Sequence, residues 1–216
     1  MLKLYTYFRS SAAFRVRIAL NYKGIPFEPE TVWLLDSEQR AEKYRKINPQ
    51  ALVPTLVDGA NTLNQSMAII EYLDETEPGP KLLPADPTGR ARVRSLSQYV
   101  ACEIHPVNNM RILAYLKNTL GLDQQHVDAW YRHWCEQGLA SFEQQISDGK
   151  AGLYCHGDSV SMADICLVPQ IFNAKRFKVD LSPYPKTIAI FDRLMLLPAF
   201  DAAQPGKQPD AARAAS

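Results

Sequence analysis

The chain has 216 residues, of which 46% are hydrophobic and 22% charged, and its 24 Lys and Arg residues nearly balance its 23 Asp and Glu residues. A disordered chain would be poorer in apolar residues, and a protein that binds nucleic acid through phosphates would show a clear basic excess. The length suits one large domain or two small ones, with enough apolar residues for a hydrophobic core.

No apolar run approaches the ~18 residues that span a bilayer. We therefore expect a soluble, cytoplasmic protein that acts on neither membranes nor nucleic acid. The four cysteines are scattered, and even the closest pair, Cys155 and Cys166, lies 11 positions apart, which is neither a Cys-x-x-Cys pair nor zinc-ligand spacing. The four histidines are equally dispersed. We expect buried, reduced thiols and no metal site.

The first part of the chain mixes strand and helix signals. Residues 2–6 alternate as a strand does, and apolar residues four apart predict a helix that starts near Ser11 and stops at Lys23-Gly24. A second strand and a short polar helix are predicted next, over residues 26–33 and 37–46. Together these elements form a β-α-β unit.

A hairpin and a helix follow. Residues 54–57 and 61–63 flank an Asp-Gly step that supplies turn residues, and Ser66 is placed to cap a helix that ends before Pro78. The order βαβ followed by ββα is typical of a thioredoxin-like domain. Val53-Pro54 lies at the entrance to the third strand, where that fold keeps a cis-proline.

The remainder of the chain is predicted to be helical. Four prolines within residues 78–87 suit a linker. Beyond it the spacing of apolar residues predicts a helix over residues 90–118 with a kink at His105-Pro106, and further helices over residues 123–146, over residues 161–177 and from about Pro185. We therefore expect a thioredoxin-like α/β domain over residues 1–83 and an all-α domain over residues 90–216.

Two features of the helical part carry further expectations. Ser161 and Asp164 have the spacing of a capping box, with Asp in place of Glu, so Asp164 is expected to be structural. The tail beyond Gln204 is rich in Ala, Pro and charge, and we expect it to contain too little apolar surface to pack tightly.

A thioredoxin-like domain usually carries its reactive group between the first strand and the first helix, because backbone N–H groups and the helix dipole favour an anion there. Here that turn, residues 9–15, contains no cysteine, which disfavours a disulfide oxidoreductase or a glutaredoxin. Any thiolate must arrive with a cofactor.

Ser10 and Ser11 lie where the sulfur of such a cofactor would need a donor. Lowering a thiol pKa from about 8.5 by two units takes ~2.7 kcal/mol, within reach of a helix N-terminus and one or two hydrogen bonds. Two serines ahead of a helix are more often simple caps. A second helix N-terminus at Gln65-Ser66, suited to a carboxylate such as the γ-glutamyl end of glutathione, favours the functional interpretation.

Motifs along nearly the whole chain resemble the zeta-class glutathione transferases. In the first half they are residues 7–11, 15–20, 48–49, 53–56 and 65–73, and in the second half residues 82–84, 162–164, 167–170, 176–181 and 183–185. Their shared order and spacing, rather than any single motif, make the resemblance specific.

The resemblance implies the glutathione transferase fold, a homodimer, and glutathione-dependent isomerisation of maleylacetoacetate to fumarylacetoacetate in aromatic amino acid catabolism. Maleylpyruvate isomerases perform the same chemistry in gentisate degradation. In both, glutathione thiolate adds to the activated cis double bond, the resulting single bond rotates, and elimination returns the trans alkene.

The resemblance also implies residue roles. Ser10 or Ser11 donates to the glutathione sulfur, with Arg15 close by. The positions that match glutathione-holding residues are Gln39, Val53, Gln65, Ser66, His105, Asn109, Met110 and Arg111. The substrate is a small dicarboxylate, and the guanidinium groups expected to bind it are those of Arg9, Arg176 and Arg111.

Structural alternatives exist for these residues. Arg9 and Arg176 could form ordinary surface ion pairs, Gln65 could simply end a strand, and His105 could be packed at a kink. The chain also departs from the Ser-Ser-Cys common in the zeta class, because its third residue is Ala12. This departure weakens a haloacid-dehalogenating activity more than isomerisation, and brings the chain closer to the maleylpyruvate isomerases.

Two other hypotheses remain open from the sequence. A transferase that conjugates glutathione to electrophiles or haloacids would use the same thiolate site without a clamp for a dianion. A glutathione-transferase-like module with a purely structural role would often lose the serine at the first helix, so the presence of Ser10 and Ser11 argues against it.

Overall fold

The computed structural model describes residues 1–214, and the chain divides into two compact units. The first contains Met1–Leu82 together with the chain from Leu196 onward, and the second is Leu83–Met195. The sequence had placed everything beyond residue 90 in the helical domain. The final segment instead belongs to the first unit, because its contacts are with that unit's strands and helices.

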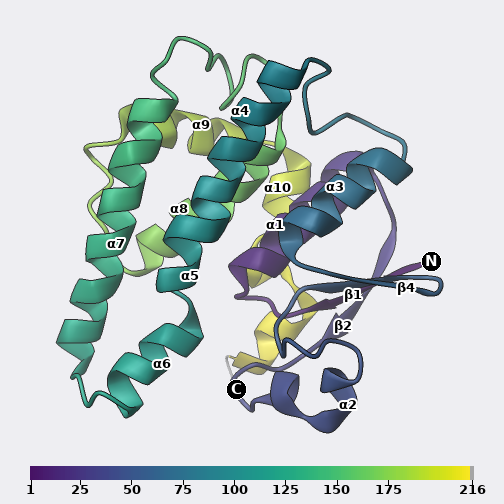
Figure 1. Ribbon diagram of the computed structural model, residues 1–216, viewed down its shortest axis with the longest axis vertical. Helices are drawn as coiled ribbons and strands as arrows, with labels where there is room; N and C mark the ends of the chain where they lie inside the picture. Colours follow the sequence, from purple (N-terminus) through teal and green to yellow (C-terminus); the bar gives the residue numbers. More distant parts are fainter. Residues whose placement is uncertain (215–216) are drawn as a thin grey trace. The chain divides into compact units, whose positions relative to one another are not determined.

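The first unit is built on a four-stranded mixed sheet with the order β2-β1-β3-β4 (Figure 1). β1 pairs in parallel with β2 and antiparallel with β3, and β4 completes the hairpin with β3. The strands are β1 (Leu2–Thr6), β2 (Phe27–Thr31), β3 (Thr55–Asp58) and β4 (Asn61–Asn64). This topology confirms the thioredoxin-like prediction, and the Val53-Pro54 peptide bond is cis.

Two helices of the first unit pack against each other. α1 (Ser11–Lys23) makes the crossover between β1 and β2, and α3 (Ser66–Thr76) follows β4. α1 ends where Gly24 adopts the left-handed conformation with φ of 68°, as the Lys23-Gly24 signal predicts. Ser66 is the first residue of α3 rather than its cap: Gln65 is the N-cap, with φ of 70° and no capping side-chain bond.

The short polar helix predicted over residues 37–46 is two separate pieces. A 3₁₀ turn, η1 (Glu38–Arg40), precedes the single-turn helix α2 (Glu42–Arg45). Ala41 between them is extended, with φ of −62° and ψ of 145°, which breaks the helical hydrogen-bond ladder.

The second unit is helical throughout its described elements. They are α4 (Pro87–Gln98), the π-helical segment η2 (Tyr99–Ile104), α5 (His105–Val107), α6 (Met110–Asn118), α7 (Gln124–Gln145), α8 (Met162–Arg176) and α9 (Pro185–Met195). Pro106 has no N–H to donate, so the regular ladder is lost around it. The disturbance spreads wider than the predicted kink, from the π-helical turns to a break at Asn108-Asn109.

Close packing in this unit depends on one glycine. A Cβ on Gly138 of α7 would lie 2.4 Å from Cγ1 of Ile104, which is inside van der Waals contact. α7 can therefore approach η2 only because residue 138 has no side chain.

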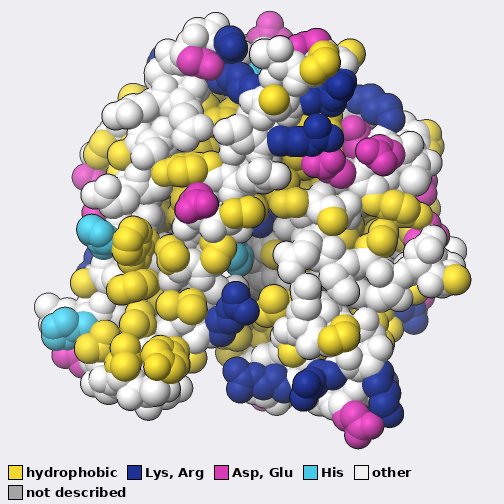
Figure 2. Space-filling model, viewed as in Figure 1, with side chains coloured by type: hydrophobic (Ala, Val, Ile, Leu, Met, Phe, Trp, Pro, Cys, Tyr) yellow, Lys and Arg dark blue, Asp and Glu magenta, His cyan; other side chains and the backbone are white. Residues whose placement is uncertain are grey.

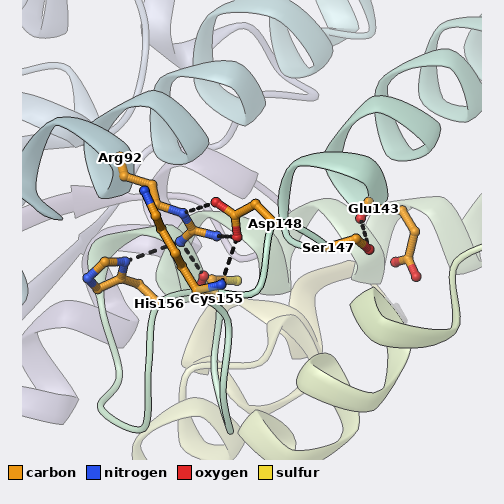
Figure 3. A network of polar contacts seen from close by, with 7 residues as sticks. Arg92, Glu143, Ser147, Asp148, Cys155 and His156 are labelled. Atoms are coloured by element: carbon orange, nitrogen blue, oxygen red, sulfur yellow. Dashed lines mark hydrogen bonds and ion pairs between the residues drawn. The ribbon is translucent and has the colours of Figure 1, made fainter. Parts of the chain in front are cut away.

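Two charged side chains hold the loop between α7 and α8 (Figure 3). Arg92 of α4 donates from Nε and Nη2 to the Asp148 carboxylate at 2.8 Å each, and from Nη1 to the Cys155 carbonyl at 2.7 Å. The hydrogen bond from Arg92 lowers the pKa of Asp148 to about 2. Asp164 of α8 accepts the Cys155 N–H at 2.9 Å. Both backbone polar groups of Cys155 are thus satisfied by charged side chains.

Asp164 also completes the predicted capping box. Its carboxylate accepts the Ser161 N–H at 2.8 Å and the Ser161 hydroxyl at 2.7 Å. The residue is fully buried, and burial raises the pKa of its carboxyl. Its structural assignment from sequence agrees with this position.

The C-terminal segment, residues 196–214, packs on the first unit, and this includes the part beyond Gln204 that was predicted from composition to pack loosely. It contains α10 (Pro198–Ala202), η3 (Pro205–Lys207) and η4 (Pro209–Ala214), and α10 lies against α1. Phe200 and Ala203 are buried and Asp210 is only 8% exposed. The number of apolar residues did not predict this packing, because several of the contacts are hydrogen bonds to the Asp210 carboxylate and to backbone carbonyl groups of the segment.

Within residues 1–214, no helix is both long and apolar enough to cross a membrane. The same residues contain no cluster of three or more His, Cys, Asp or Glu side chains placed to hold a metal ion.

We expect Asp164→Ala to lower the free energy of unfolding by roughly 2–5 kcal/mol, because two buried N–H groups lose their acceptor. Urea denaturation followed by circular dichroism measures the loss. Asp158→Ala is the matched control, since exposed Asp158 accepts the Leu153 N–H at 2.8 Å, and its loss should cost about 1 kcal/mol or less. Equal losses in the two variants would contradict the structural role of Asp164.

Candidate functional site

The turn between β1 and α1 places Ser10 and Ser11 at the start of the helix. Ser10 is the N-cap, and its Oγ accepts the Ala13 N–H at 3.2 Å. Ser11 is the first helical residue and is 5% exposed. Ser10 therefore does cap the helix. Accepting this hydrogen bond uses a lone pair of the oxygen and leaves the hydroxyl proton able to donate to a ligand.

The electrostatics of this turn favour an anion. The first turn of α1 carries no acidic side chain, so its N–H groups and dipole are not offset by a carboxylate of the helix itself. A thiolate or carboxylate of a ligand would be stabilised there for the same reason that helix N-termini bind phosphates.

A buried hydrogen bond joins this helix to the second predicted anion site. Arg15 of α1 donates from Nη1 to Oγ of Ser66 at 3.3 Å, and the two residues are 2% and 6% exposed. Ser66 is the first residue of α3. Arg15 lies on the helix that Ser10 caps, and its guanidinium reaches the N-terminus of α3 at Ser66. The structure thus links three predicted site residues.

Gln65, next to Ser66, is held by a neighbour that the sequence did not indicate. Its Nε2 donates to Oε1 of Gln50 at 2.8 Å on the surface, and its backbone is in a strained positive-φ conformation. Backbone strain of this kind is characteristic of functional turns. The residue type does not predict the strain, because glutamine rarely adopts a positive φ.

A buried polar cluster fixes the loop that carries Val53. The Tyr44 hydroxyl and Asn48 Nδ2 both donate to the Leu52 carbonyl, at 2.6 and 2.8 Å, and Asn48 Nδ2 also donates to Thr55 Oγ1 at 3.1 Å. Asn48 entered the sequence-based prediction as part of the family motif at residues 48–49, and its role in this cluster was not predicted. The signal available in the sequence is the pair of polar residues, Asn48 and Thr55, on either side of the Val53-Pro54 bond that was expected to be cis.

Gln39 lies in η1, and within residues 1–214 no hydrogen bond joins its side-chain oxygen to another predicted site residue. It is 8% exposed, and its buried Oε1 has no hydrogen-bond partner within residues 1–214. Buried polar atoms without a partner are rare in native proteins and commonly mark a ligand contact.

Beside Gln39, a cavity of about 360 Å³ opens next to η1 and α2, and its lining is mostly basic: Arg40, Glu42, Arg45, Lys46 and Pro49. Figure 2 shows Lys and Arg side chains gathered around α2. None of the predicted site residues lines this cavity.

In the second unit, predicted residues cluster where α5 gives way to α6. Asn109 caps α6 by accepting the Arg111 N–H at 3.1 Å, and its amide lies 3.3 Å from Nε2 of His105. Met110 and Arg111 are exposed at the helix start. The four residues therefore lie within about two helical turns of one another, and the contact with Asn109 is compatible both with a site residue and with a histidine packed at a kink.

The two further guanidinium groups predicted for the substrate lie on aromatic rings. Arg9 of the first unit is exposed and sits 4.9 Å from the centre of the Phe8 ring. Arg176, the last residue of α8 in the second unit, is exposed and sits 4.9 Å from the Phe177 ring. Each guanidinium lies within cation–π distance of the ring next to it in sequence, and both remain candidates for a carboxylate ligand.

The cysteines take no part in these clusters. Cys135, Cys155 and Cys166 are buried, as predicted, whereas Cys102 is exposed in η2, contrary to the prediction of four core thiols. The prediction rested on the scattered spacing of the cysteines, which does not tell which face of a helical turn a side chain occupies. Burial raises the pKa of Cys135 to about 12, which suppresses its reactivity.

Comparison with known proteins identifies the chain's relatives. Residues 9–76 match the family model described as the glutathione S-transferase N-terminal domain. A probable maleylacetoacetate isomerase of Vibrio cholerae is 48% identical, over 96% of this chain and 97% of its own length.

Solved structures agree. The holo structure of a maleylpyruvate isomerase, a bacterial glutathione S-transferase of the zeta class, superposes with a TM-score of 0.95 at 47% identity, over 97% of this chain and 99% of the other. A maleylacetoacetate isomerase of Methylobacterium extorquens AM1, with bound malonate and glutathione, superposes with a TM-score of 0.94 at 41% identity, again over 97% and 99%.

Proposed function

Because the chain belongs to the zeta-class glutathione transferases, we propose that it is a glutathione-dependent isomerase that converts a maleyl-keto dicarboxylate to its trans isomer. The observation that carries the proposal is the buried bond from Arg15 to Ser66, which joins two helix N-termini. One of these carries Ser10 and Ser11. The arrangement offers a thiolate and a carboxylate of one peptide ligand separate positions.

The residues of the first unit suit glutathione chemically. The tripeptide carries a thiol, two carboxylates and amide groups. Helix N-termini and Arg15 favour its anionic groups, and the unpartnered Gln39 Oε1 can accept one of its N–H groups. Val53, Gln65 and Ser66 are proposed to hold its backbone and γ-glutamyl end. The residues His105, Asn109, Met110 and Arg111 are included in the proposal because their positions match glutathione-holding residues of the family.

The chain's own part in catalysis is to stabilise an anion. Bound glutathione supplies a thiolate that adds to the cis double bond and leaves after rotation about the resulting single bond. Ser10 or Ser11 is proposed to donate its O–H to that sulfur. Because Ser10 Oγ accepts the Ala13 N–H, its O–H is polarised and becomes a better donor. Arg15 adds a nearby positive charge.

Arginines are proposed to bind the substrate's carboxylates. Guanidinium matches carboxylate geometry bidentately, and Arg9, Arg111 and Arg176 are all exposed. The malonate in the Methylobacterium isomerase is itself a dicarboxylate, which supports this class of substrate.

Maleylacetoacetate is the first substrate proposed, and maleylpyruvate is the second. Sequence identity does not separate the two, at 48% to a probable maleylacetoacetate isomerase and 47% to a maleylpyruvate isomerase. Ala12, in place of the cysteine common at that turn of the zeta class, supports the second.

Loss of each cis substrate, followed by absorbance with and without glutathione, tests the function. We expect glutathione-dependent turnover of at least one of the two, and the better substrate decides between them. Turnover of neither substrate would refute the proposal, and conjugation alone would establish a transferase.

Arg176→Ala should reduce isomerisation by about 10- to 100-fold while conjugation of a neutral electrophile is retained, because only the dianion needs the guanidinium.

Ser10→Ala and Ser11→Ala identify the thiolate donor. Loss of a charge-assisted hydrogen bond should raise the pKa of bound glutathione by about one unit in the variant that removes the main donor. Thiolate absorbance near 240 nm against pH measures it. Ser95→Ala, on α4 of the second unit, is the control and should titrate like the unaltered protein. Unchanged titration in both serine variants would contradict the assignment.

We also propose that the protein works in the cytoplasm as a homodimer. Its cysteines are free thiols, which suits a reducing compartment. Large apolar side chains gather over α6 and α7 in Figure 2, and the exposed ones include Met110, Tyr115, Leu120 and Trp134. Exposed apolar patches commonly mark protein interfaces. Sedimentation velocity should give twice the chain mass, and a monomer at micromolar concentration would exclude the dimer.

A further inference from the structure

The backbone of Phe8, two residues before Ser10, is held by two oppositely charged side chains. Its N–H donates to Oδ2 of Asp210 at 2.8 Å, and its carbonyl accepts from Nη2 of Arg17 at 3.0 Å. Phe8 is 4% exposed, so water does not replace either partner readily. Asp210 lies 202 positions further along the chain, in the C-terminal segment.

Arg17 links the same segment to the rest of the turn. Its guanidinium is 1% exposed and donates to Oγ1 of Thr6 at 3.0 Å, to the Tyr7 carbonyl at 3.3 Å and, from Nε, to the Ala203 carbonyl at 3.2 Å. Burial lowers its pKa to about 10, and the charge of Asp210 acts against that change. A buried cation is tolerated only where its donors are satisfied, so this network is sensitive to the loss of any member.

A stack of rings and guanidinium groups ties the end of the segment to the same turn. Arg213 lies 4.5 Å from the Trp33 ring centre and donates to Asp36 at 2.7 Å. Trp33 stacks on Phe8 with the ring centres 5.8 Å apart. The guanidinium of Arg9 lies 4.9 Å from the centre of the same Phe8 ring. The segment therefore contacts the backbone of Phe8 directly, through Asp210, and is linked to its side chain through Trp33.

We propose that Asp210 and Arg17 are positioning residues, through which the C-terminal segment fixes residues 6–9 and so aims the Ser10 hydroxyl and the first N–H groups of α1 at the glutathione sulfur. The inference rests on the proposed function, because it assigns the segment a role in that same site. Neither residue needs to touch glutathione or substrate.

The path from Asp210 to Ser10 is short. The Ser10 N–H donates to the Tyr7 carbonyl at 2.9 Å, and this carbonyl also accepts from Arg17. If Asp210 is removed, the Phe8 N–H loses its acceptor, and the peptide must turn to recover a partner. Rotation of that peptide moves the cap residue directly. Displacement of a catalytic group by about 1 Å can cost 10²-fold in rate.

The test is a graded series at one position. Asp210→Ala removes the acceptor, Asp210→Asn keeps a neutral one, and Asp210→Glu keeps the charge on a longer stem. We expect kcat of the isomerase to fall about 10- to 100-fold in the alanine variant, less in asparagine and least in glutamate. The pKa of bound glutathione should rise in the same order. Asp201→Asn is the matched control, because that carboxylate bonds Gln204 and Lys207 within the segment itself.

These readouts separate positioning from simple stabilisation. A merely structural Asp210 would lower the melting temperature while the folded fraction keeps the thiolate pKa and kcat of the unaltered protein. That result, or equal behaviour of Asp210→Ala and Asp201→Asn, would overturn the inference. Failure of the unaltered protein to bind glutathione would instead refute the proposed function, and the inference would fall with it.

A measurement on the unaltered protein covers the case in which Asp210→Ala does not fold. Coupling between two sites is reciprocal, so a segment that aids the thiolate site must be stabilised when the site is filled. Hydrogen exchange by mass spectrometry should show slower exchange in peptides from residues 203–214 when glutathione saturates the protein. Unchanged exchange in those peptides, with slowing at residues 10–16, would contradict the proposal.

Discussion

The N-terminus of α1 is the feature on which the rest of the site depends. Its N–H groups point at one place, its first turn carries no acidic residue, and Ser10 closes it as a cap. Buried Arg15 extends the positive field to Ser66 at the start of α3. A fold with no cysteine at this turn can still stabilise a thiolate, provided that the sulfur is supplied by a bound peptide.

Each unit uses a pair of oppositely charged side chains to hold both backbone polar groups of one residue. In the first unit Asp210 and Arg17 satisfy the N–H and carbonyl of Phe8, and in the second Asp164 and Arg92 satisfy those of Cys155. In both cases the residue lies in irregular backbone on the N-terminal side of a helix. Irregular backbone that is buried needs such partners, since no neighbouring strand or helix supplies them.

Local patterns in the sequence were enough for much of the architecture of each unit. The Asp-Gly hairpin, the Gly24 stop and the Ser161–Asp164 box are decided within a few residues, whereas the cis bond at Val53-Pro54 was expected only from the thioredoxin-like order of elements. The role of residues 196–214 was missed, because Asp210 acts on Phe8, 202 positions away, and no local pattern encodes such a pairing. The exposure of Cys102 was missed because the spacing of the cysteines does not tell which face of a helical turn a side chain occupies, and the broken end of α5 because a π-helical stretch shifts the helical period.

We propose that the start of α1 lowers the pKa of a thiol that the chain does not itself carry. The most direct measurement is thiolate absorbance of glutathione against pH in its complex with the unaltered protein, compared with free glutathione. We expect a midpoint about two units below that of the free thiol. A midpoint equal to that of free glutathione, with binding demonstrated by calorimetry, would contradict it.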